Sequence, residues 1–118
     1  METEITEAKL YEYAVNIERE LKQYAQYESK AKAISDLIGY FLTDHILEIR
    51  REQTLINGRW ETDRYIFLVT YGGPNAWIYT DGNIKVVWGG KSLEYIISDK
   101  EVLEFLKNVE YFLNQTLP

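Results

Sequence analysis

Two glycine-rich stretches contain the residues of this chain that are best suited to bind a ligand. Gly72-Gly73-Pro74-Asn75 ends an apolar run, and Gly89-Gly90 directly follows Trp88. Glycine permits close backbone approach and positive φ, and consecutive backbone N–H groups in such turns can hold an anion. No helical pattern follows Gly72-Gly73, so this stretch is neither a Walker loop nor a dinucleotide fingerprint. Both stretches are also typical of plain turns.

A second set of polar residues lies upstream, at Asp44, His45, Glu48 and Arg50. A histidine held by a carboxylate is a general base, but adjacent residues on a strand point to opposite faces, which favours a structural role for His45. With one histidine and no cysteine, the chain excludes a multi-His or Cys-based metal site and thiolate catalysis. We therefore predict no catalytic residues, no metal and no cofactor. The alternative is an enzyme that binds a small ligand or nucleotide at the glycine stretches, with Asn75 among its polar groups.

The elements that must position these residues are expected in the order helices, sheet, helix. Apolar residues spaced by three and four predict a helix over about residues 5–27, followed by a second helix or a bent continuation over 31–42. The period then changes to two, and the chain contains β-formers on both sides of Asn57-Gly58, the strongest short hairpin signal. The helical stripe of the first segment consists of Leu10, Ala14, Ile17, Leu21 and Tyr24.

A two-residue turn at Asn57-Gly58 fixes the register of the first hairpin. It predicts the pairs Leu47 with Leu68, Ile49 with Ile66, Arg51 with Arg64, and Glu52 with Asp63. The last two pairs bring like charges together, which is unfavourable across a sheet. We therefore predict a bulge or a longer loop between Gln53 and Thr62.

A second hairpin is expected to turn at Asp81-Gly82. That turn predicts a single face made of Trp77, Tyr79, Ile84, Val86 and Trp88, and such an aromatic face is typical of a core packed against a helix. Residues 93–97 can add a fifth strand. Ser98, three residues before Glu101, predicts a capping box that opens a C-terminal helix. The expected fold is a single α+β domain over 1–118, with a four- to five-stranded antiparallel sheet and this last helix packed on it.

These registers bring both glycine stretches to one rim of the sheet. The candidate binding residues of the rim are His45, Glu48, Arg50, Gly72, Gly73, Pro74, Asn75, Trp88, Gly89 and Gly90. Trp60 is a separate candidate at the tip of the first hairpin. An exposed tryptophan beside an arginine is typical of an interface hot spot, although a tryptophan that packs back on its own strand is at least as common.

Composition narrows the classes of partner. The net charge of −6 argues against direct nucleic-acid binding, which needs clustered Lys and Arg. No signal sequence or membrane-spanning run is apparent, so we expect a cytoplasmic protein that does not bind membranes. Four of the ten tyrosines lie on the first predicted helix, and Tyr11 and Tyr27 are expected at its edge or exposed. Such a surface favours protein contact, including an alternative homodimer through this helix.

Three motifs carry a family resemblance: Glu48-Ile49-Arg50, then Thr70-Tyr71-Gly72-Gly73-Pro74, then Trp88-Gly89. Together they resemble small uncharacterised proteins of phages and other mobile elements, in which a strand ends in Thr-Gly-Gly-Pro. The likeness covers about residues 31–113. It departs at Tyr71, which separates Thr70 from Gly72, and in the absence of an acidic tract before Trp88.

The resemblance implies no enzyme activity. It suggests a non-enzymatic accessory protein, acting inside the host cell on a protein partner. Small acidic accessory proteins of this kind often inhibit host defence, so the implied partner is a nucleic-acid-handling complex of a CRISPR or restriction system.

Overall fold

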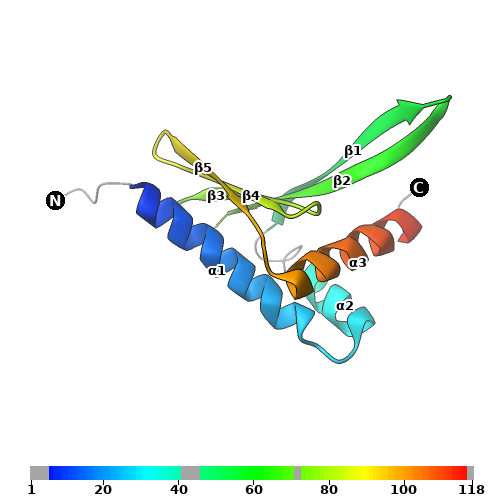
Figure 1. Ribbon diagram of the computed structural model, residues 1–118, viewed down its shortest axis with the longest axis horizontal. Helices are drawn as coiled ribbons and strands as arrows, with labels where there is room; N and C mark the ends of the chain where they lie inside the picture. Colours follow the sequence, from blue (N-terminus) through cyan, green and yellow to red (C-terminus); the bar gives the residue numbers. More distant parts are fainter. Residues whose placement is uncertain (1–5, 41–45, 71–72, 117–118) are drawn as a thin grey trace.

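The computed structural model describes residues 6–40, 46–70 and 73–116, and shows an α+β fold (Figure 1). A helical pair precedes a five-stranded antiparallel sheet whose strands are neighbours in chain order, and a C-terminal helix packs on that sheet. The predicted fold class is therefore confirmed. The elements are α1 (Glu7–Ala25), α2 (Lys30–Tyr40), β1 (Ile46–Ile56), β2 (Arg59–Thr70), β3 (Asn75–Tyr79), β4 (Asn83–Trp88), β5 (Lys91–Ile96) and α3 (Lys100–Thr116).

All three helices lie on one side of the sheet, and the described residues leave its other side uncovered (Figure 1). The predicted stripe of α1 is buried from Leu10 to Leu21, whereas Tyr24 is half-buried and stacks on Phe105 of α3. None of the helices in the described part of the chain is long and apolar enough to cross a membrane. The core contributed by α3 and the sheet consists of Val102, Phe105, Leu106, Val109, Leu113, Tyr65, Phe67, Val69, Ala76, Ile78, Ile84 and Val86.

The first hairpin has the predicted turn but not the predicted register. Asn57 and Gly58 have φ values of 50° and 78°, as a two-residue turn between twisted strands requires. A bulge follows, because Asp63 is an extra residue between the pairs Gln53 with Thr62 and Glu52 with Arg64. A bulge was predicted between Gln53 and Thr62, and it lies one residue further along β2, at Asp63. Its effect is to replace the like-charge pairs with the attractive pair of Glu52 and Arg64. The predicted apolar pairs are wrong, since Ile49 pairs with Phe67, Arg50 with Ile66, and Glu48 with Leu68.

The second hairpin is longer by one residue than predicted. Thr80 remains bound to β2, donating its backbone N–H to the Tyr65 carbonyl at 3.0 Å and accepting the Tyr65 N–H on its hydroxyl at 2.9 Å. The connection therefore spans residues 80–82, and Trp77 pairs with Lys85 instead of Val86. Because side chains alternate between faces, this shift moves Trp77 and Tyr79 to the uncovered face. The predicted core face is therefore wrong for Trp77 and Tyr79. Ile84 and Val86 are in the core as predicted, together with Ala76 and Ile78, and Trp88 packs against its edge.

The C-terminal helix begins one residue later than the predicted capping box requires. Asp99, not Ser98, caps α3, accepting the N–H groups of Glu101 at 2.9 Å and Val102 at 3.2 Å on Oδ1. The same carboxylate binds the Lys22 ammonium of α1 at 2.8 Å. One side chain thus starts α3 and joins it to α1.

Candidate binding surfaces

The structure brings together part of the predicted rim. A Cβ atom on Gly73 would lie 3.2 Å from the indole of Trp88, so the two predicted glycine stretches do meet at one end of the sheet. Trp88 also packs edge-to-face on Tyr13 of α1, with ring centroids 5.4 Å apart. His45 and Gly72 lie outside the described residues. At the described part of the rim, the turn that contains Gly73 therefore packs against the half-buried side chain of Trp88.

The backbone at the rim is explained by the turns themselves. Gly89 and Gly90 have φ values of 59° and 79° and form the two-residue turn that pairs Trp88 with Lys91. Pro74 is buried, and Asn75 is exposed. The hollow next to Trp88 holds about 330 Å³ and is lined on its other side by α1 residues, including Lys9, Glu12 and Asn16. Of the glycines that the structure describes at the rim, none lines this hollow.

Glu48 and Arg50 lie on the uncovered face of β1, where they form an ion pair. Arg50 Nε is 2.9 Å from Glu48 Oε1, and this hydrogen bond raises the pKa of Arg50. In the register of the sheet Arg50 is level with Tyr79, which is four residues from Asn75 along β3. That separation is about 13 Å along the strand direction. Arg50 and Asn75, two of the polar groups proposed for an enzyme site, therefore lie well apart on this face, and His45 is outside the described residues.

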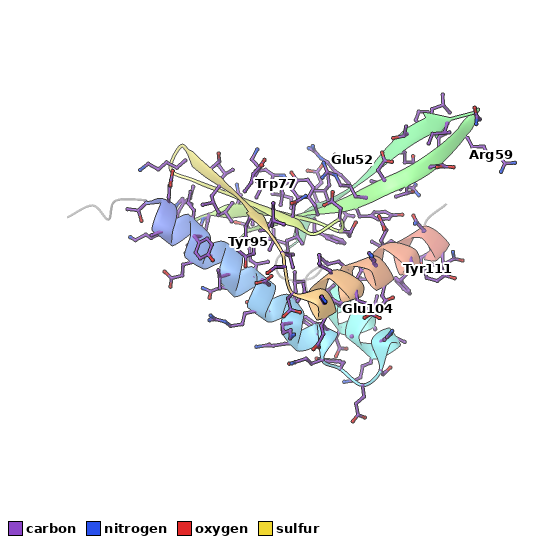
Figure 2. All side chains as sticks on the ribbon, in the orientation of Figure 1. Glu52, Arg59, Trp77, Tyr95, Glu104 and Tyr111 are labelled. Carbon is purple, nitrogen blue, oxygen red and sulfur yellow. The ribbon has the colours of Figure 1, made fainter. Side chains whose placement is uncertain are left out.

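Trp60 lies far from the rim, at the other end of the first hairpin. Beyond the pair of Glu52 and Arg64, β1 and β2 continue as a two-stranded projection that diverges from the helices, with Arg59 at its tip (Figures 1 and 2). We call residues 53–62 the arm. Trp60 pairs across the arm with Leu55, and these side chains are 65% and 56% exposed. Trp60 therefore does not pack back on its own strand.

The base of the arm is held by a cluster of charges. Arg64 binds Glu52 at 2.7 Å and Asp81 at 2.9 Å, and its guanidinium carbon lies 4.4 Å from the ring centroid of Tyr79. The hydrogen bond with Glu52 is the largest of the effects that raise the pKa of Arg64. Thr54 and Asp63 add a side-chain hydrogen bond of 2.5 Å at the bulge. These contacts fix the direction in which the arm leaves the sheet.

The uncovered face of the sheet is the surface that the sequence did not predict. Figure 2 shows Trp77 and Glu52 on the side away from the helices. Lys85 lies over the Trp77 ring at 5.9 Å, so long cationic side chains cover both aromatic rings of β3. Beside them, a depression of about 400 Å³ is lined by Arg64, Tyr79, Lys85, Glu94 and Ile96, among others. The alternation of Lys85 with the apolar Ile84 and Val86 indicates that Lys85 faces solvent, but Trp77 can be placed on the same face only once the register that pairs it with Lys85 is known.

Among the described residues, no group of three or more histidine, aspartate or glutamate side chains is arranged to hold a metal ion. No protein-family model, curated protein or solved structure that was compared with the chain matches it.

Proposed function

We propose that this protein is a non-enzymatic binding module that contacts a protein partner through its arm. The observation that carries the proposal is the exposure of Trp60 and Leu55, paired on one side of the arm. Large apolar side chains that gather on a projecting element of a folded domain are typical of interaction sites. Ile56, on the other side of the tip, is 44% exposed and extends the apolar surface around it.

Tryptophan gives such a surface most of its binding energy. Buried tryptophans are enriched among interface hot spots, where truncation costs about 2 kcal/mol or more, equivalent to roughly a 30-fold loss of affinity. Arg59 lies next to Trp60 and supplies a charged group at the edge of the contact. A hot spot of this type needs a partner with an apolar pocket that admits the indole ring.

The rigid base of the arm also favours binding. The two-residue turn at Asn57-Gly58 and the contacts of Arg64 with Glu52 and Asp81 order the arm before it meets a partner. Ordering a flexible side chain on association costs about 0.5–1.5 kcal/mol, so an arm that is already ordered retains more of its contact energy.

The class of partner remains the one that the resemblance to phage proteins implies. We propose a nucleic-acid-handling host complex, such as a CRISPR or restriction system, as the first class to test. The net charge of −6 supports this choice, because such complexes have basic surfaces that attract acidic proteins. This attraction would weaken as the salt concentration rises.

Trp60→Ser tests the proposal, with Tyr111→Ser as the matched control. Tyr111 lies on α3, away from the arm, and is 68% exposed, close to the 65% of Trp60. Affinity capture from host lysate should recover a stoichiometric partner with the wild type and with Tyr111→Ser, and lose it with Trp60→Ser. Equal recovery with all three proteins contradicts the arm as the contact surface.

A further inference from the structure

Among the strands that the structure describes, β1 lies at one edge of the sheet, and none of them pairs with its outer side. In the part of the chain that the structure describes, β2 is the one element against which β1 packs extensively. Edge strands are usually short or otherwise blocked, because their free N–H and C=O groups can pair with another chain. The opposite edge, β5, follows this rule with six residues, whereas β1 has eleven. The β1 edge is therefore the place where another strand can join the sheet.

The sequence of β1 is complementary to itself in two antiparallel registers. One is centred on Ile49 and opposes Glu48 with Arg50, but it overlaps only residues 48–50 of the regular strand; the other is centred on Arg51 and overlaps more. Its regular part starts at Glu48, after a register shift between Ile46 and Glu48. Along an edge strand, every second residue directs its backbone N–H and C=O groups outward. In a symmetric antiparallel pair these residues must face each other, so the two-fold axis passes between one residue and its own copy. Centring on Arg50 opposes Arg50 with itself and Glu48 with Glu52. Centring on Arg51 instead opposes Arg50 with Glu52 twice.

We propose that two copies of this chain pair through β1, antiparallel and centred on Arg51, to form one continuous ten-stranded sheet. Residues 48–54 of the two copies then lie side by side, with Glu48 opposite Thr54 and Ile49 opposite Gln53. A charged edge normally opposes pairing. Here the order of the charges makes this register attractive and the register centred on Arg50 repulsive.

The ion pairs within each copy extend this complementarity. Arg50 is paired with Glu48, and Glu52 is paired with Arg64, all on the uncovered face of the sheet. When Glu52 of a second copy lies beside Arg50, charges of alternating sign form a row across the interface. The row consists of Glu48 and Arg50 of one copy followed by Glu52 and Arg64 of the other, and it occurs once on each side of the two-fold axis. All four side chains are 28–65% exposed, so they reach the interface without a change of fold.

The register contains one unfavourable pair. Arg51 meets Arg51 of the second copy at the two-fold axis, on the face opposite to Arg50.

This dimer is independent of the proposed partner site. The pairing uses the backbone edge of β1, whereas Trp60 belongs to β2, one strand further inside the sheet. Trp60→Ser should therefore leave the dimer unchanged, and charge reversal in β1 should leave Trp60 exposed. The two proposals can fail separately.

Sedimentation equilibrium from about 1 to about 200 µM covers the affinity expected for a small interface of this kind. The wild type should reach twice its mass of 13.9 kDa. Arg50→Glu or Glu52→Arg alone should raise the Kd at least tenfold, because each makes both symmetric pairs repulsive. An equimolar mixture of these two variants restores opposite charges in both pairs, and should form a heterodimer with a Kd within a few-fold of the wild type.

Glu94→Arg is the matched control, since it reverses an exposed glutamate on β5 at the other edge of the sheet. It should leave the Kd unchanged. Circular dichroism of every variant verifies the fold, and a variant that is unfolded is replaced by the charge-neutral Arg50→Gln or Glu52→Gln, which should weaken the dimer by a smaller factor.

A disulfide tests the register directly. The chain has no cysteine, so Arg51→Cys introduces a single thiol at the proposed two-fold axis. Mild oxidation should link two copies through this position, where paired Cα atoms lie within the range of a disulfide. Lys107→Cys on the exposed side of α3 should remain unlinked. A wild-type monomer throughout the concentration range, or a dimer that is insensitive to the β1 charges and to Arg51→Cys oxidation, overturns the proposal.

Discussion

At the residue scale, Gly82 joins three elements through one backbone position. It has a φ of +108° in the connection from β3 to β4, and its carbonyl accepts the N–H of Ile97 at 2.8 Å. A Cβ atom there would lie 2.6 Å from Cδ2 of Leu103 on α3. The backbone conformation therefore favours glycine, and the end of the Leu103 side chain would have to move to admit a Cβ atom.

Gly82→Ala should destabilise the fold by about 2–4 kcal/mol, combining a strained φ with a steric clash. Gly90→Ala is the matched control: it has a φ of +79°, but no atom lies within 4 Å of its added Cβ. This variant should lose about 1 kcal/mol, from backbone strain alone. Urea denaturation measures both, and equal losses would show that the contact with Leu103 is unimportant.

Asp99 gives the fold a dependence on pH. The Lys22 hydrogen bond is the main cause that lowers the pKa of Asp99 below its ordinary 3.8. A carboxylate whose folded pKa is lowered stabilises the fold above its unfolded pKa, and this stabilisation is lost as the pH falls through the folded pKa. The free energy of unfolding should therefore decrease below about pH 4.

Asp99→Asn and Asp99→Ala separate the charge from the cap. The asparagine retains a capping oxygen and loses the ion pair with Lys22, so it should lose less stability than the alanine at neutral pH. The difference between the wild type and Asp99→Asn should narrow in acid. Ser98→Ala, at the cap position predicted from the sequence, should be nearly neutral, and a larger loss there would contradict the assignment of Asp99 as the cap.

At the element scale, the Asn57-Gly58 turn was predictable from sequence, but the registers of the two hairpins were not. Asn57-Gly58 defined its turn correctly, because positive φ at two successive residues selects these types. The second hairpin failed because Thr80 binds the backbone of Tyr65, a residue fifteen positions earlier, and local sequence does not reveal such a contact. A shift of one residue exchanges the two faces of a strand, so this single error misplaced Trp77 and Tyr79.

The arm should be removable without loss of the fold. Glu52 and Arg64 are directly opposite, so replacing residues 53–63 with Asn-Gly leaves a two-residue turn between them. None of the core residues lies in the deleted segment. Thermal and urea denaturation of this armless variant should give a stability within about 1 kcal/mol of the wild type. A variant that does not fold would show that the arm is a structural element.

At the scale of the whole molecule, the arm and the β1 edge make the chain more extended than its length requires. Its radius of gyration is 15.1 Å, with principal extents of 53, 36 and 27 Å. A compact domain of this length has a radius of about 13.5 Å. The arm adds to this length as a two-stranded projection with a large exposed aromatic residue, Trp60, through which we propose that the protein binds its partner.

Affinity capture with the armless variant tests this assignment most directly. The wild type should recover a stoichiometric partner from host lysate, and the armless variant, verified as folded, should recover none of it. Recovery of the same partner at the same yield by the folded armless variant would show that binding takes place elsewhere on the molecule, and would contradict the account.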